Sequence, residues 1–344
     1  MQHPASSIKS HPKDSAPPFL SIVVPVYNEQ DVLPEFHRRL SAVLDAMTVS
    51  AEIIYVNDGS RDNSIHVIQA LKDDDSRVAV IDLSRNFGKE IALSAGLDHA
   101  EGDAVVVIDA DLQDPPEFIP ELFKRWLEGG VEVVYAKRVA REGESFMKKA
   151  TAHAFYRVMR MASTVQLPED TGDFRLLSRR AVHALRRLRE HHRFMKGLFA
   201  WIGFRQEAIP YRRAPRYAGS TKWNYWKLWN FALEGITSFT IFPLKVSTYL
   251  GLFTSLGAFI YALVIIAKTV IHGDPVRGYP SLMVVILFLG GIQLLGIGVI
   301  GEYMGRMFNE SKQRPLYLLN QYSSSEISRL RSGIHSNNGE EQDG

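Results

Sequence analysis

The chain has 344 residues, of which 23% are charged, and a formal net charge of +2. That length exceeds one average domain but leaves room for little more than a large domain and a small appendage. The sequence contains no cysteine, which excludes disulfide bonds and zinc sites with cysteine ligands. A mean hydropathy of −0.09 is typical of a soluble protein, but it averages over two long apolar runs near the C-terminus.

The first part of the chain alternates short apolar runs with helical patterns. Residues 1–18 contain no apolar core of a signal peptide and predict a disordered lead-in. Further on, β-branched runs predict strands at 20–26, 52–57, 78–83, 104–109 and 131–136, with helices near 30–46, 63–73, 88–100 and 117–128. This order predicts an α/β domain with a largely parallel sheet and with ligand chemistry at the carboxyl ends of the strands.

The region after the fifth predicted strand has helical patterns and many basic residues, followed by a predicted loop at 205–222. Between positions 175 and 227 there are 14 Lys or Arg residues and two acidic residues. Such a stretch before an apolar segment suits anionic lipids or phosphates, and no nucleic-acid-binding motif accompanies it. Residues 223–241 carry a tryptophan at every third position (Trp223, Trp226 and Trp229), which predicts an amphipathic helix in the membrane interface. A tryptophan stripe packed against the protein itself is the alternative.

Two apolar segments predict a transmembrane hairpin within residues 242–305. Residues 246–267 and 281–301 contain 22 and 21 residues without a charge, enough to cross a hydrocarbon core of about 30 Å. The 13 residues between them force an antiparallel hairpin, so the N-terminal part and the tail at 306–344 share one side of the membrane. That side should be cytoplasmic, because basic residues flank the outer ends of the spans (Lys222, Lys227, Lys245, Arg306, Lys312 and Arg314). The tail is predicted to be disordered after Gln321.

The strongest chemical signal follows the strand predicted at 104–109. Asp109-Ala-Asp111-Leu-Gln113-Asp114-Pro-Pro places two carboxylates at positions i and i+2 beyond a strand end. A turn can bring such carboxylates onto one hard divalent cation, and the oxygens of a bound diphosphate would complete its ligands. A solvated turn before Pro115 is the alternative.

Short polar turns also follow the first two predicted strands. Pro25-Val-Tyr27-Asn28-Glu29 and Asn57-Asp58-Gly59-Ser60 place hydrogen-bond acceptors where a nucleotide would lie across the sheet. Alone, Asn28 or Ser60 could simply cap a helix. Three such turns at neighbouring strand ends together favour a site for a nucleotide and a metal ion.

Together these motifs resemble a family 2 glycosyltransferase of the GT-A fold, in the branch that transfers sugars to dolichyl or polyprenyl phosphates. The likeness is greatest to the bactoprenol glucosyltransferases. Further segments that carry it are Ser84-Arg-Asn-Phe-Gly-Lys89, Thr171-Gly-Asp-Phe-Arg175-Leu, His192-Arg-Phe-Met-Lys-Gly197 and Asp274-Pro-Val-Arg-Gly-Tyr279. The resemblance covers residues 20–317 and implies a Rossmann-like GT-A catalytic domain at 19–222, followed by the paired membrane helices.

The resemblance also implies roles for individual residues. The nucleoside would be held by Pro25, Tyr27, Glu29 and Asp58. The metal, Mg²⁺ or Mn²⁺, would be surrounded by Asp109, Asp111 and Gln113. The phosphates would meet Arg138, Arg175, Arg216 and Lys222, the last two in a glycine-containing flap whose alternative is an ordinary basic surface loop. Asp173 is a candidate positioning group or base, and it joins Asp111 and Arg175 as a predicted catalytic residue.

The predicted reaction is the inverting transfer of glucose from UDP-glucose to undecaprenyl phosphate, a membrane lipid, for cell-surface glycan modification. A phosphate monoester has a second pKa near about 6 and is largely dianionic at neutral pH, so a general base is not obligatory. The resemblance implies a bacterial inner-membrane protein and suggests a homotetramer. GDP-mannose and a UDP-aminoarabinose derivative stay open as donors, and so does the choice between Mg²⁺ and Mn²⁺.

Two other functions fit parts of the sequence. A processive polysaccharide synthase would share the same site, but two spans are too few for an enclosed channel and no QxxRW motif occurs. A non-catalytic flippase or assembly scaffold could retain the transferase fold. The intact set of Asp109, Asp111 and Gln113 argues against that second alternative.

Overall fold

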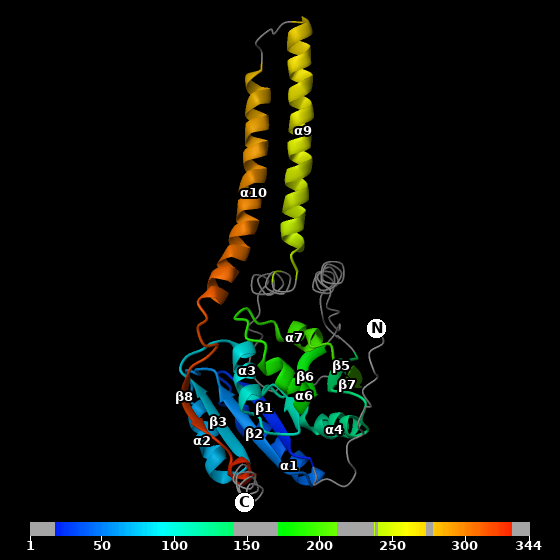
Figure 1. Ribbon diagram of the computed structural model, residues 1–344. Coiled ribbons are helices and arrows are strands. Elements are labelled where there is room, and N and C mark those ends of the chain that lie inside the picture. The colour runs from blue at the N-terminus through cyan, green and yellow to red at the C-terminus, as the bar shows by residue number, and fades with distance from the viewer. Residues whose placement is uncertain (1–17, 140–170, 212–236, 238–239, 273–277, 332–344) are drawn as a thin grey trace, which may run out of the picture.

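An eight-stranded sheet lies at the centre of the N-terminal part of the chain (Figure 1). The computed structural model describes residues 18–139, 171–211, 237, 240–272 and 278–331. Across the sheet the strands follow the order β7-β5-β6-β4-β1-β2-β3-β8. Their bounds are β1 Leu20–Val26, β2 Ala51–Asn57, β3 Val78–Leu83, β4 Ala104–Val107, β5 Val133–Arg138, β6 Thr171–Ser178, β7 Gln206–Tyr211 and β8 Leu319–Ser323.

The middle of the sheet is parallel, and this brings strand ends together. β4, β1, β2 and β3 pair in parallel, so their carboxyl ends meet at one edge. β6 runs antiparallel between β4 and β5, β7 pairs in parallel with β5, and β8 runs antiparallel along β3. A mixed sheet of this kind is common when strands are added outside a parallel core.

Helices cover both faces of the sheet. Consecutive side chains of a strand point to opposite faces, so strands that are apolar throughout present two apolar faces to be buried. Ile22 and Val24 belong to the core on the side of α1, whereas Val23 belongs to the core on the side of α3. α3 packs so closely that a Cβ on Gly96 would lie 2.3 Å from Cγ1 of Val23. The helices are α1 Leu33–Met47, α2 Ser64–Asp74, α3 Lys89–His99, the 3₁₀ turn η1 Pro116–Phe118, α4 Ile119–Leu127, α6 Arg179–Arg186, α7 Met195–Trp201, α9 Phe242–His272 and α10 Tyr279–Ser311.

The five predicted strands are confirmed as β1 to β5, with shifts of a few residues at their ends. The prediction was wrong after β5, where the helical and basic pattern conceals β6 and β7. All eight residues of β6 are buried, yet three of the first five are Thr171, Asp173 and Arg175. Those polar side chains interrupt the apolar run by which a buried strand is recognised in a sequence.

The prediction of a disordered tail after Gln321 was also wrong, up to Arg331. β8 supplies the eighth strand by pairing with β3, and the helical turn that follows it buries Ser325 and Ser328. Lys72 donates a hydrogen bond to the carbonyl oxygen of Ser324 at 2.7 Å. The segment is largely polar, so it is ordered mainly by backbone hydrogen bonds to the edge strand β3 and less by the burial of apolar side chains.

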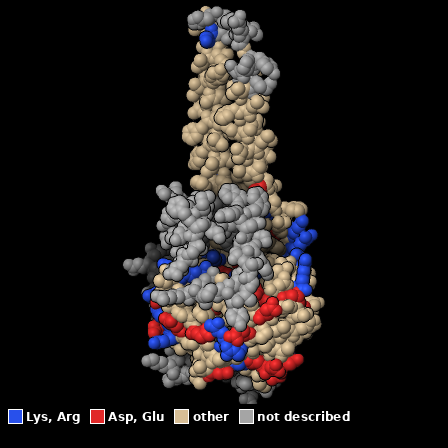
Figure 2. All heavy atoms as spheres, turned by 180° about the vertical axis from the view of Figure 1, so that it is seen from behind, with Lys and Arg blue, Asp and Glu red and all other residues tan. Residues whose placement is uncertain are grey.

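The two long helices confirm the predicted hairpin. α9 and α10 lie side by side and project away from the sheet (Figure 1). Their apolar stretches, residues 242–268 and 284–311, have mean hydropathies of 2.2 and 2.4 and bury none of their side chains within the protein. Figure 2 shows a column without charged residues between its ends, above a base where charges of both signs gather. Helices of this length and composition associate with a membrane. α10 continues six residues beyond the predicted end at 305.

Candidate active site

The residues predicted to bind the nucleotide lie at the carboxyl edge of the parallel strands. β1 and β2 pair in register up to Val26 and Asn57, so the turns after them are neighbours. The amide N–H of Asn28 donates to Oγ of Ser60 at 3.0 Å, and Oδ1 of Asn28 accepts from the N–H of Arg61 at 2.8 Å. Neither Asn28 nor Ser60 caps a helix, so the capping alternative is wrong. The two turns instead hold one another, and they leave Tyr27 36% exposed at this edge.

Asp58 is buried and holds the loop that leads into α3. Its carboxylate accepts the N–H groups of Phe87 at 2.7 Å and of Gly88 at 3.0 Å. Burial raises the pKa of Asp58, and these two N–H donors act against that rise. The loop also lies against Gly59, where a Cβ would be only 2.5 Å from the backbone of Arg85. Asp58 is therefore a positioning group for the loop, and its predicted contact with the nucleoside stays a prediction.

The three candidate metal ligands follow β4 in one turn. Oδ1 of Asp111 accepts the N–H of Gln113 at 3.1 Å, and Leu112 between them has a φ of 57°. Among the described residues, no three His, Cys, Asp or Glu side chains are grouped closely enough to hold a metal by themselves. The carboxylates of Asp109 and Asp111 nevertheless fit a hard divalent cation that takes its remaining oxygen ligands from a diphosphate. Gln113 adds a neutral oxygen to that set.

Asp109 lies next to Asp173, which comes from a different part of the chain. Val107 of β4 pairs with Arg175 of β6, and two further steps along this antiparallel register bring Asp109 opposite Asp173. Lys89, the first residue of α3, lies between them. Its Nζ is 2.7 Å from Oδ1 of Asp109 and 2.6 Å from Oδ2 of Asp173. Lys89 was not a predicted site residue, although its place after the third predicted strand, at the same edge of the sheet, could have indicated one.

The charges around Asp173 set its ionisation. Burial alone would raise the pKa of Asp173, but the ammonium groups of Lys89 and Lys196 hold it well below its usual range. Oδ1 of Asp173 is buried and has no hydrogen-bond partner among the described residues. Burial raises the pKa of the neighbouring Glu90 to about 7, with the charge of Asp173 adding to the effect. Asp173 is therefore an ionised carboxylate, one oxygen of which is buried without a hydrogen bond among the described residues.

Two arginines support this end of the sheet. Arg175 is buried, donates to the carbonyl oxygen of Gly172 at 2.8 Å, and lies 3.8 Å from the ring centroid of Phe199. Burial lowers its pKa to about 10. These contacts place Arg175 behind Asp173, and its predicted contact with phosphate stays a prediction.

Arg138, at the end of β5, lies beside Gly172, the residue before Asp173 in β6. A Cβ on Gly172 would be 2.9 Å from its Nη2, so glycine makes room for the guanidinium. Asp114, which was not a predicted metal ligand, is buried and accepts a hydrogen bond from the hydroxyl of Tyr211. The other predicted phosphate ligands, Arg216 and Lys222, lie outside the described residues, as do the three tryptophans.

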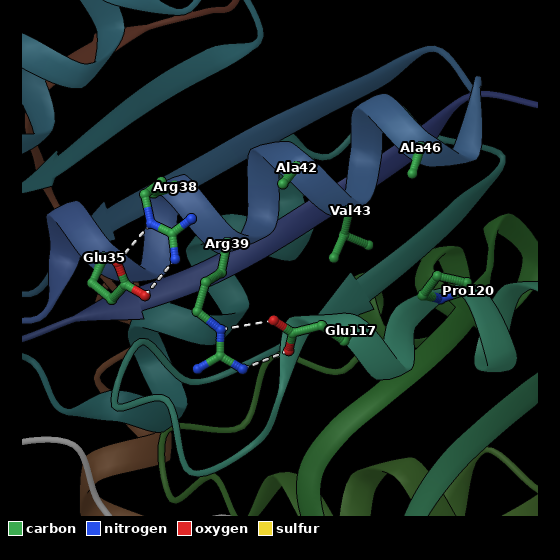
Figure 3. A pocket seen from close by; sticks show the side chains of 8 residues that line it. All are labelled: Glu35, Arg38, Arg39, Ala42, Val43, Ala46, Glu117 and Pro120. Atoms are coloured by element: carbon green, nitrogen blue, oxygen red, sulfur yellow. Dashed lines mark hydrogen bonds and ion pairs between the residues drawn. The ribbon is translucent and has the colours of Figure 1, made fainter.

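A shallow groove on the flank of the domain, between α1 and the η1–α4 segment, does not belong to this site (Figure 3). Its charges are already paired. Arg38 binds Glu35 through two hydrogen bonds of 2.7 and 2.8 Å, and Arg39 binds Glu117 through two of 2.7 and 2.6 Å. None of the residues that line it is a predicted site residue, so the groove offers no free charge for an anionic substrate.

Known proteins agree with the fold and with the hairpin. The family described as "Glycosyl transferase family 2" matches residues 21–186, and that described as "GtrB C-terminal hairpin" matches residues 242–307. An uncharacterized glycosyltransferase of Synechocystis sp. is 54% identical over 300 residues, which cover 87% of this chain and 94% of that one. A bactoprenol glucosyl transferase of Shigella phage SfV is 49% identical, covering 87% and 97% of the two chains.

A crystal structure of glucosyl-3-phosphoglycerate synthase from Mycobacterium tuberculosis is more distant, with 22% identity and a TM-score of 0.42 over 64% of this chain and 78% of that one. The fold and its turns at the carboxyl edge define a GT-A glycosyltransferase with a membrane hairpin. The chain belongs to glycosyl transferase family 2, as its near full-length similarity to these relatives shows.

Proposed function

We propose that the protein transfers glucose from UDP-glucose to undecaprenyl phosphate with inversion at the anomeric carbon, assisted by Mg²⁺ or Mn²⁺. The observation that carries this proposal is the 49% identity to bactoprenol glucosyl transferases along nearly their whole length. The juxtaposition of Asp109 and Asp173 on one ammonium group supports it, because it brings a candidate metal ligand and a candidate acceptor-side carboxylate together. The membrane hairpin supports a lipid acceptor for the same reaction.

The residues of the site suit a phosphate acceptor. A sugar hydroxyl would need a general base, and the low pKa of Asp173 makes it a weak one. An attacking phosphate monoester is already largely dianionic above its second pKa of about 6 and needs only to be oriented. Asp109, Asp111 and Gln113 would hold the divalent cation, which when bound neutralises the departing diphosphate. Arg138, Arg216 and Lys222 would add positive charge at the phosphates.

The orientation in the membrane is part of the proposal. The basic residues at the outer ends of the spans support a cytoplasmic catalytic domain in a bacterial inner membrane. A homotetramer is part of the proposal because the family resemblance suggests it. Protease digestion of vesicles of known sidedness tests the orientation. Cleavage of the loop at 273–278 from the side of the catalytic domain would contradict it. Cross-linking in membranes, followed by mass determination, tests the number of subunits.

The reaction is tested by incubating the purified full-length protein with radiolabelled UDP-glucose and undecaprenyl phosphate, with and without Mg²⁺ or Mn²⁺. We expect metal-dependent label in the organic phase. Asp111→Asn should lower transfer at least about 100-fold while the protein stays folded, because one ligand charge is lost at nearly constant volume. Asp73→Asn, an exposed change on α2, is the matched control. If label enters the lipid only from GDP-mannose or a UDP-aminoarabinose derivative, the proposed donor is wrong and the proposed transfer to the lipid phosphate stands.

A further inference from the structure

Lys89 holds a single positive charge between two carboxylates that the proposed reaction uses separately. Its Nζ lies within 2.8 Å of both oxygens of Asp109 and 2.6 Å from Oδ2 of Asp173. The side chain of Lys89 is 43% exposed, whereas those of Asp109 and Asp173 are only 22% and 11% exposed. The side chain of Lys89 therefore lies on a more open side of the site than the two acids that its ammonium binds.

The backbone around Lys89 is fixed for this contact. The two residues before it donate their N–H groups to the buried carboxylate of Asp58. Gly88, directly before it, has a φ of 98°, a conformation that other residues rarely adopt. The backbone from which the Lys89 side chain extends is thus held by the turn after β2 and by the loop before α3.

A divalent cation and the Lys89 ammonium compete for Asp109. A carboxylate that is engaged by an ammonium has fewer oxygen lone pairs to offer a metal, and two cations on the same side of it repel each other. A nucleotide diphosphate changes this balance, since its oxygens bring negative charge that can contact both cations at once.

We infer that Lys89 is a resident counter-cation that makes metal binding at Asp109 depend on the nucleotide diphosphate. In the free protein the ammonium holds Asp109 and weakens its affinity for a divalent cation. When the diphosphate arrives with the metal, the ammonium gives up Asp109 and contacts Asp173 and the diphosphate. This inference rests on the proposed function, because it assigns Lys89 a part in the same metal-dependent site.

The test measures Mn²⁺ binding directly, by the loss of the electron paramagnetic resonance signal of free Mn²⁺, on the full-length protein with and without UDP. Lys89→Met removes the charge and keeps an unbranched side chain that is one atom shorter, Lys89→Gln is a second neutral variant, and Lys89→Arg keeps the charge. Lys124→Met, an exposed change on α4, is the matched control. Thermal unfolding of each variant verifies that it is folded.

We expect UDP to tighten Mn²⁺ binding to the wild type, and both neutral variants to bind Mn²⁺ without UDP about tenfold more tightly than the wild type. The effect of UDP on Mn²⁺ affinity should shrink by the same factor in the neutral variants. Lys89→Arg and Lys124→Met should retain the wild-type behaviour. Glucose transfer should fall in the neutral variants despite their tighter metal binding.

Two outcomes overturn the inference, and they are distinguishable. If the wild type binds Mn²⁺ with UDP and the neutral variants match it in both conditions, Lys89 does not couple the two ligands, and the proposed function stands. If the wild type transfers glucose but binds no Mn²⁺ even with UDP, the metal dependence in the proposed function is wrong and the role of Lys89 is wrong with it.

Discussion

The substitution Asp58→Asn separates two roles of one buried residue. In the structure the carboxylate accepts the N–H of Phe87 through Oδ1 at 2.7 Å and the N–H of Gly88 through Oδ2 at 3.0 Å. Asparagine keeps one acceptor oxygen, so the N–H of Gly88 loses its 3.0 Å bond to Oδ2 and keeps only its longer 3.3 Å contact with Oδ1. A hydrogen bond to a charged group contributes about 1.5–3 kcal/mol, so the loop should lose about 2 kcal/mol of local stability. Exchange of these two amide hydrogens should then accelerate about 30-fold, at 1.4 kcal/mol for each factor of ten.

Hydrogen exchange with mass spectrometry, on overlapping peptides that cover residues 84–90 in the absence of nucleotide, measures this directly. Asp62→Asn is the matched control, because Asp62 accepts the N–H groups of Ser64 at 3.0 Å and Gln30 at 3.3 Å and does not bind the loop before α3. Unchanged exchange of the loop together with weakened UDP binding would refute the reasoning. Asp58 would then contact the nucleoside directly, as the family resemblance implies.

Two further predictions concern other carboxylates, one at the start of α3 and one near the end of α10. Burial raises the pKa of Glu90 from 4.5 to about 7, so ionising it costs the folded state stability as pH rises through that interval. The free energy of unfolding of Glu90→Gln, relative to the wild type, should therefore rise between pH 4.5 and 7 and stay constant above pH 7. Denaturant unfolding at several pH values measures this difference. A difference that does not vary with pH would contradict the prediction. Glu310, near the end of α10, accepts the N–H of His191 at 2.7 Å. Glu310→Ala should speed hydrogen exchange around residues 190–194, because a hydrogen bond to a charged group contributes about 1.5–3 kcal/mol of stability. Glu302→Ala is the control and should leave that exchange unchanged. Equal exchange in both variants would rule out this contact.

The order of the first strands and the hairpin followed from the sequence because both depend on local patterns. A buried parallel strand is a continuous run of apolar, often β-branched residues, as in β1 to β4, and it is visible without any partner. A membrane span is recognised by the length and the apolar composition of one continuous segment. The turn from Asp109 to Gln113 was found for the same reason, since its carboxylates lie two residues apart and directly follow a strand.

What the sequence did not determine depends on contacts between distant segments. β6 contains Asp173 and Arg175, so its strand character became visible only once β4 and β5 paired with it on either side. β8 is ordered by the open edge of β3, more than 200 residues before it. The ammonium of Lys89 joins residues that are 20 and 84 positions away. A sequence pattern records which side chains share a face of one helix or strand. Only the packed sheet decides which faces meet, and the charges that meet there determine what the site can bind.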